Sequence, residues 1–90
     1  MTSPVSPLLE GLVVFSTRSC MPCRQLKSQL DEAKLDYKTI DLTEEENDHY
    51  KFKYNIRAVP TVGLFKEDKL VSSRVGNDAT VESLRELLQS

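Results

Sequence analysis

The chain has 90 residues, of which 39% are hydrophobic and 29% are charged, and its net charge is −2. This composition is typical of one small globular domain and excludes a disordered chain. The small negative charge gives no general attraction to nucleic acids or anionic membranes, and no stretch approaches the ~20 apolar residues that span a bilayer.

The first ten residues contain two prolines and three serines or threonines. We expect residues 1–10 to form a flexible lead-in to a single domain over residues 11–90. The lead-in has neither a basic segment nor an apolar run, so it does not resemble a secretory signal. We therefore expect a cytoplasmic protein, and structural disulfides are rare in that compartment.

A buried strand and an amphipathic helix are predicted next. Leu12 to Phe15 form a continuous apolar run, which is typical of a strand buried on both faces. Pro22 suits the first turn of a helix, where its missing N–H leaves no hydrogen bond unmade. Apolar residues then recur at helical spacing, at Cys23, Leu26, Leu30 and Ala33.

A second strand and a second helix follow. Tyr37 to Asp41 alternates enough to predict a short strand. Thr43 and Glu46 match a capping box, which predicts a helix over about residues 44–53. Tyr50 and Tyr54 are the best candidates for its buried side.

The last part of the chain predicts a β-hairpin and a helix. Residues 62–65 and 70–75 read as two strands joined by a polar turn. The final helix has apolar positions at Val81, Leu84, Leu87 and Leu88, with Asp78 or Thr80 as its N-cap. The complete order is β-α-β-α-β-β-α, in which the first two strands are parallel and the hairpin is antiparallel.

Cys20 and Cys23 are the only cysteines, and they lie where the first strand meets the first helix. Residues three apart on a helix have Cβ atoms about 5–6 Å apart. A disulfide tolerates Cα separations of roughly 4.4–6.8 Å. The pair can therefore close and open with little backbone movement, and this arrangement is the sequence sign of a thioredoxin-like redox site.

The position of each cysteine on the helix predicts its role. Cys20 lies at the helix N-terminus, where free N–H groups and the helix dipole favour an anion. Motifs of this kind lower a cysteine pKa to about 3.5–7.5. We expect Cys20 to attack a substrate disulfide and Cys23, one turn inside, to resolve the mixed disulfide. Arg18 and Arg24 flank the pair and would favour the thiolate further.

The element order, the Cys20-x-x-Cys23 motif and Val59-Pro60-Thr61 together resemble the thioredoxin superfamily over about residues 11–88. The segments 54–61 and 64–66 are very similar to those of thioredoxin itself. The resemblance implies an α/β fold with a mixed four-stranded sheet flanked by three helices. It also implies that Pro60 is cis and faces the active site, and that Val59 offers backbone hydrogen bonds to a docked substrate strand.

The activity implied by the resemblance is that of a thiol-disulfide oxidoreductase without a bound cofactor. It would carry electrons to disulfide-containing client proteins, and ribonucleotide reductase is a typical client in the family. The chain departs from thioredoxin in having no tryptophan, with Ser19 before the first cysteine. Val14 occupies the place of the buried acid, so no carboxylate is evident to take the proton of Cys23.

Other features are closer to glutaredoxin, so the sequence leaves the reductant open between a thioredoxin reductase and glutathione. Residues 16–19 resemble the glutaredoxin segment before the motif, although Thr17 replaces its lysine and the aromatic residue within the motif is absent. Gly76-Asn77 replaces its paired glycines, and Asp78 fits the acidic residue that often follows. Arg18 and Asp78 are therefore candidate substrate contacts, beside Val59 and Pro60.

Two alternatives to a thioredoxin-like carrier remain. One is a glutathione-dependent glutaredoxin. The other is a non-catalytic module that uses the edge at Val59-Pro60 to hold a partner or the cysteine pair to hold a metal. A zinc site needs four ligands, or three and a water, which two cysteines and the lone His49 do not supply. We expect no metal site, no nucleic-acid or membrane partner, and a monomer.

Overall fold

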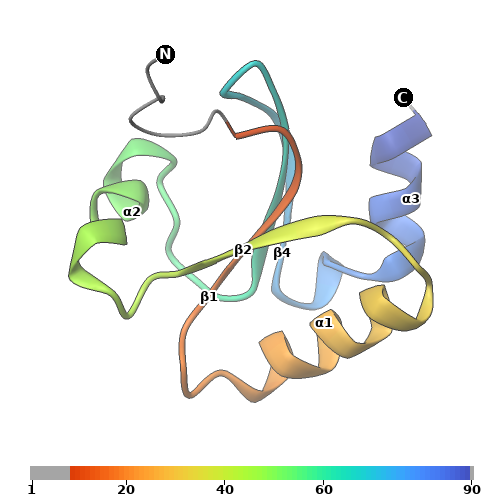
Figure 1. Ribbon diagram of the computed structural model, residues 1–90, viewed down its shortest axis with the longest axis horizontal. Helices are drawn as coiled ribbons and strands as arrows, with labels where there is room; N and C mark the ends of the chain where they lie inside the picture. Colours follow the sequence, from red (N-terminus) through yellow and green to blue (C-terminus); the bar gives the residue numbers. More distant parts are fainter. Residues whose placement is uncertain (1–8, 90) are drawn as a thin grey trace, which may run out of the picture.

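The computed structural model describes residues 9–89, and within them the predicted order of helices and strands is confirmed (Figure 1). The elements are β1 (Gly11–Ser16), α1 (Met21–Glu32), β2 (Tyr37–Asp41), α2 (His49–Lys53), β3 (Thr61–Lys66), β4 (Lys69–Val75) and α3 (Val81–Gln89). Residues 1–8 of the expected lead-in lie outside the described residues. No helix among residues 9–89 is both long and apolar enough to cross a membrane.

The four strands form one mixed sheet, as predicted, and their order in the sheet is β2-β1-β3-β4. β1 pairs with β2 in parallel and with β3 antiparallel, and β3 pairs with β4 antiparallel. Residues 12–16 of β1 are all buried, because this strand is central in the sheet and is covered on both faces. The carboxyl end of β1 leads directly into the loop that carries Cys20.

Alternate residues of β1 point into two separate apolar cores, one on each face of the sheet. Figure 1 shows α1 and α3 on one face and α2 on the other. The core under α1 and α3 is built from Leu12, Val14, Leu26, Leu30, Val62, Leu64, Ala79, Leu84 and Leu87. The core on the α2 face is built from Leu9, Val13, Phe15, Leu42 and Phe65, with Tyr50 and Tyr54 packed against it.

The turn between β3 and β4 fixes the end of the sheet opposite the cysteine pair. Glu67 and Asp68 both have positive φ, 52° and 68°, as a two-residue hairpin turn of type I′ requires. Asp68 also holds Leu9: its carboxylate accepts a hydrogen bond from the Leu9 N–H at 3.2 Å, and its own N–H donates to the Leu9 carbonyl at 3.0 Å. The described chain is therefore anchored to the sheet from its first residue.

Helix α1 ends in a Schellman motif, which sets the length of the helix that carries the cysteines. Lys34 takes the left-handed conformation, with φ 60°. The Leu35 N–H donates to the Leu30 carbonyl at 3.0 Å, and the Lys34 N–H donates to the Asp31 carbonyl at 3.1 Å. These bonds satisfy carbonyls that the helix leaves free at its end.

The prediction of one continuous helix over residues 44–53 is wrong. The structure has a single 3-10 turn over Glu45–Asn47, followed by the short helix α2. The predicted capping box does not form, because the Thr43 hydroxyl accepts a hydrogen bond from the Arg18 N–H at 3.1 Å. The Thr43 N–H is directed to the Asp41 carboxylate at 2.8 Å. Thr43 thus belongs to a loop contact and not to a helix start.

Thr80, one of the two predicted caps, begins α3. Its hydroxyl accepts a hydrogen bond from the Ser83 N–H, and the Ser83 hydroxyl accepts one from the Thr80 N–H, both at 3.1 Å. This reciprocal pair satisfies donors that the first turn leaves free. The other candidate, Asp78, is exposed and ends a 3-10 turn over Gly76–Asp78.

Candidate active site

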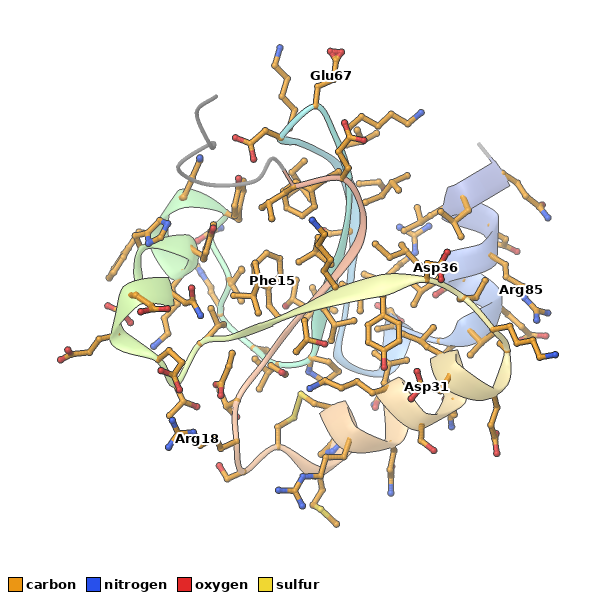
Figure 2. The ribbon with its side chains drawn as sticks, viewed as in Figure 1. Phe15, Arg18, Asp31, Asp36, Glu67 and Arg85 are labelled. Carbon is orange, nitrogen blue, oxygen red and sulfur yellow. A yellow bond between two sulfur atoms is a disulfide. The ribbon has the colours of Figure 1, made fainter. Side chains whose placement is uncertain are left out.

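The two cysteines form a disulfide at the start of α1, visible as the sulfur–sulfur bond in Figure 2. Their Cα atoms are 5.3 Å apart, within the range expected from the spacing. Cys20 is the N-cap residue, with extended backbone, and Met21 and Pro22 form the first helical positions. The Cys20 sulfur accepts a hydrogen bond from the Cys23 N–H at 3.2 Å. A sulfur at this position accepts hydrogen bonds from N–H groups that have no partner within the helix.

The two sulfurs differ in their surroundings. Cys20 keeps 8% of its surface exposed, at the end of the helix. Cys23 is 1% exposed and lies on the same helical face as the core residues Leu26 and Leu30. Of the two sulfur-bearing residues, Cys20 is thus the more accessible to a molecule that approaches the end of the helix.

Pro60 lies beside this helix, where it shares a cavity with residues of the first two turns. The Val59-Pro60 peptide bond is cis. Pro60 and Pro22 line one small cavity of about 160 Å³ between α1 and the loop after β4, together with Gly76 and Asn77. The Pro60 carbonyl accepts a hydrogen bond from the Gly76 N–H at 2.8 Å, which joins the two loops.

Two other candidate substrate contacts, Val59 and Asp78, do not line this cavity. Val59 is half-buried and packs against the core on the α2 face. Asp78 does not line the cavity at Pro60, whereas its neighbour Asn77 does. The Asp78 backbone carbonyl accepts a hydrogen bond from the Ser83 hydroxyl at 2.6 Å. A role of the Asp78 side chain in substrate binding stays a prediction.

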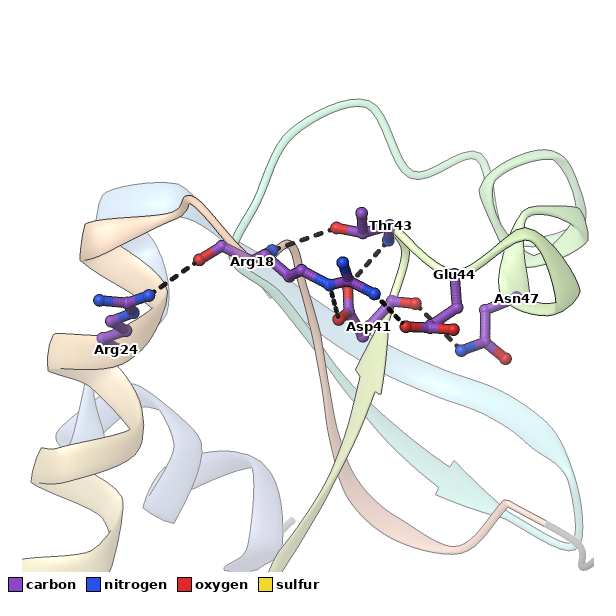
Figure 3. Close-up of polar contacts among 6 residues, drawn as sticks. All are labelled: Arg18, Arg24, Asp41, Thr43, Glu44 and Asn47. Carbon is purple, nitrogen blue, oxygen red and sulfur yellow. Dashed lines mark hydrogen bonds and ion pairs between the residues drawn. The ribbon is translucent and has the colours of Figure 1, made fainter.

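Arg18 links the loop before Cys20 to the loop after β2 (Figure 3). Its guanidinium pairs with the Glu44 carboxylate at 2.5 Å and with the Asp41 carboxylate at 3.6 Å. Its carbonyl accepts a hydrogen bond from the Arg24 guanidinium at 3.1 Å. The charge of Arg18 is therefore balanced by two carboxylates, and these contacts hold the loop that presents Cys20.

A second cavity, of about 400 Å³, lies behind Cys23 on the side of β2. Its walls come from the end of β1 and the following loop, from α1 and from β2. It is lined by Cys23, by the cations Arg18, Arg24 and Lys27, by the hydroxyl residues Ser16, Thr17 and Thr39, and by Asp41. This cavity is polar and contains a carboxylate, although no carboxylate near the cysteines was expected from the sequence.

Asp41 is the site residue that sequence reasoning missed. It ends β2, and its carboxylate accepts the N–H of Thr43, two residues on, at 2.8 Å. Aspartate at the end of a strand often forms such a turn, so the Asp41-Leu42-Thr43 segment carried a signal. Hydrogen bonds from the Thr43 backbone and side chain lower the pKa of Asp41, and Arg18 lowers it further.

This lowered pKa predicts how Asp41 contributes to stability. A depressed carboxyl pKa stabilises the fold above the unfolded-state pKa of about 3.9, and the contribution is lost as the pH falls through the folded-state pKa. Asp41→Asn should therefore be less stable than the parent at pH 7, with the difference vanishing in acid. Urea unfolding of both proteins across this pH range measures it. A difference that persists unchanged below the folded-state pKa would contradict the explanation.

Among residues 9–89, no group of three or more histidine, cysteine, aspartate or glutamate side chains is placed to hold a metal ion. His49 is exposed on α2, and its ring contacts that of Tyr50 with centroids 4.1 Å apart.

Comparison with known proteins gives matches over most of the chain. The family model described as thioredoxin matches residues 7–90. A thioredoxin of Rickettsia bellii is 36% identical over 72 residues, which cover 76% of this chain and 69% of that protein. The structure of thioredoxin O1 from Arabidopsis thaliana in its oxidized state has a TM-score of 0.70 and 28% identity, covering 90% of this chain and 76% of that one.

A shorter relative also matches. The N-acetyl-S-hydroxy-L-cysteine reductase of Bacillus subtilis is 36% identical over 56 residues, which cover 60% of both chains, so the two chains are similar in length. The chain spans 63–69% of the length of three curated thioredoxins, that of Rickettsia bellii among them. These matches favour the thioredoxin reading of the motifs over the glutaredoxin alternative.

Proposed function

The chain belongs to the thioredoxin family of thiol-disulfide oxidoreductases, and we propose that it reduces disulfides of client proteins through its own cysteine pair. The observation that carries the proposal is the Cys20–Cys23 disulfide at the start of α1, next to the loop of Pro60. A pair that closes within one helical turn stores two electrons when it is open and releases them when it closes. No bound cofactor is needed for this exchange.

The first step is an attack by the Cys20 thiolate on one sulfur of the client disulfide. A Cys20–client disulfide forms, and the other client sulfur leaves as a thiolate with the electron pair of the broken bond. The hydrogen bond from the Cys23 N–H and the end of the helix dipole stabilise negative charge on Cys20. Cys23 then attacks Cys20, which closes the internal disulfide and releases the second client sulfur.

We place the client backbone along Val59, whose peptide groups precede Pro60 at the rim of the site. An extended client segment would exchange hydrogen bonds with this edge and bring its disulfide to Cys20. Arg18 is engaged with Asp41 and Glu44, and this supports a role in holding the loop more than a role in contacting the client. Asn77, on the cavity wall beside Pro60, is a further candidate contact.

We propose a thioredoxin reductase as the electron donor and a reducing compartment such as the cytoplasm as the place of action. Thioredoxins reduce disulfides in client proteins, generally with electrons from such a reductase. Ribonucleotide reductase is the client class that we would test first. In a reducing compartment the Cys20–Cys23 pair would be reopened after each turnover.

Two coupled assays test the proposal. With NADPH and thioredoxin reductase, the chain should drive continuous reduction of a protein disulfide, followed as loss of NADPH. With glutathione and glutathione reductase, turnover should be low. Strong turnover with glutathione that survives Cys23→Ser would reveal a monothiol glutaredoxin mechanism and would overturn the proposal.

A second candidate function is the reduction of small S-hydroxylated thiols. It is favoured by the Bacillus subtilis relative, which is close to this chain in length and is named for such a substrate. Cys20 would attack the S–OH sulfur and water would leave, after which Cys23 would release the reduced thiol. Turnover of N-acetyl-S-hydroxy-L-cysteine, compared with turnover of a protein disulfide, separates the two functions.

A further inference from the structure

The proposed reaction requires a place for the proton of Cys23. In the mixed disulfide only Cys23 is a free thiol, and a thiol must lose its proton before it can attack. Cys23 is 1% exposed, so it can meet water over only a very small part of its surface. Val14 of β1 packs into the same core as Leu26 and Leu30 of the cysteine helix, and it is fully buried and carries no acceptor. The proton of Cys23 must therefore pass to an acceptor that lies elsewhere than in this apolar core.

The cavity behind Cys23 supplies a route to such an acceptor. Its volume of about 400 Å³ holds several water molecules, since one water needs only about 10–15 Å³ of such space. Ser16, Thr17 and Thr39 contribute hydroxyl groups that donate and accept hydrogen bonds. Water and these hydroxyls together form a path for a proton between Cys23 and the β2 side of the cavity.

Asp41 supplies the only carboxylate among the described residues that line the cavity. The charged side chains around it are Arg18, Arg24 and Lys27, which are cations and accept no proton. From these facts we propose that Asp41 accepts the proton of Cys23, through water in this cavity, when Cys23 resolves the mixed disulfide. The inference rests on the proposed function, because it assigns a role within that reaction.

The contacts of Asp41 are compatible with this role. A carboxylate has about four lone-pair sites, and the contacts to the Thr43 backbone, the Thr43 side chain and Arg18 occupy three of them. These contacts lower the pKa of Asp41, so the carboxylate is charged at neutral pH and would hold an accepted proton only briefly. The cations Arg24 and Lys27 favour the Cys23 thiolate once it forms.

The Cys23 S–H proton passes to water and then to the Asp41 carboxylate. The Cys23 sulfur bonds to Cys20, and the bond between Cys20 and the client breaks. The client sulfur leaves as a thiolate with both electrons, and Asp41 returns its proton through water to that thiolate or to solvent.

Stopped-flow reaction of the reduced protein with 4,4′-dithiodipyridine tests the inference. This uncharged probe releases one thiopyridone when Cys20 attacks and a second when Cys23 resolves, so one trace reports both steps. Asp41→Asn should leave the first phase unchanged and slow the second at least about a hundredfold near neutral pH, the low side of what a proton acceptor contributes. The rate of the second phase should also need a higher pH to reach its plateau.

Glu44→Gln is the matched control. It also removes one carboxylate from Arg18, but Glu44 does not line the cavity. Both phases should keep their rates in this variant. The inference is overturned if Asp41→Asn leaves the second phase as fast as in the parent, if it slows both phases alike, or if Glu44→Gln slows the second phase equally. A parent protein that releases no thiopyridone would refute the proposed function itself.

Discussion

Cys23→Ser should accumulate a covalent complex with client proteins, whereas Cys20→Ser should form none. Without Cys23 the Cys20–client disulfide cannot be resolved, so the reaction stops after its first step. Without Cys20 the reaction lacks its nucleophile, and we expect turnover to fall at least about a thousandfold. Non-reducing electrophoresis and mass spectrometry of the trapped adduct measure both results.

The two serine variants are controls for each other, because each removes one sulfur of the same disulfide. Both should lose the internal disulfide equally, so a difference in trapping reports chemistry and not stability. Adducts formed on Cys23 in the Cys20→Ser variant would reverse the assignment. A Cys20→Ser protein that still binds its partner in the reduced state would indicate the non-catalytic module.

Leu84→Ala should lower the free energy of unfolding by about 2–5 kcal/mol, because Leu84 is fully buried and its removal leaves a cavity. It packs from α3 into the same core as Leu26 and Leu30 of the cysteine helix. Domains of this size have only about 5–15 kcal/mol of stability. We expect a fall in melting temperature of at least about 8 °C, at ~4–8 °C for each kcal/mol.

Leu88→Ala on the same helix is the matched control. Leu88 is 45% exposed, so the same substitution should change the free energy of unfolding by only about 0.5 kcal/mol. Urea unfolding of both variants measures the difference. Equal destabilisation at the two positions would show that Leu84 does not lie on the side of α3 that packs against the sheet.

The sequence predicted well those parts of the fold that depend on local patterns. The apolar run in β1, the helical spacing after Pro22 and the alternation in β2 each appear in the structure within one or two residues. Periodicity reports which face of an element is buried, and the buried faces build both cores. The cysteine spacing likewise predicted the disulfide at the N-terminus of α1.

The errors occur where a side chain has competing partners. Thr43 and Glu46 have the spacing of a capping box, but the hydroxyl of Thr43 is used by the Arg18 N–H, 25 positions earlier in the chain. The partners of the Arg18 guanidinium lie on β2 and after it, and no local pattern indicates which carboxylate a long side chain reaches. For the same reason Asp41 was not identified near Cys23, since only the parallel pairing of β1 with β2 brings them to one cavity.

The most direct test of the account is a single turnover without any reductase. The chain is fully reduced, separated from the reductant and mixed with an excess of a protein disulfide, and the products are alkylated and analysed by mass spectrometry. We predict that each chain reduces one client disulfide and ends with Cys20 bonded to Cys23. No reduction of the client, or oxidation that ends in disulfides between chains, would contradict the account.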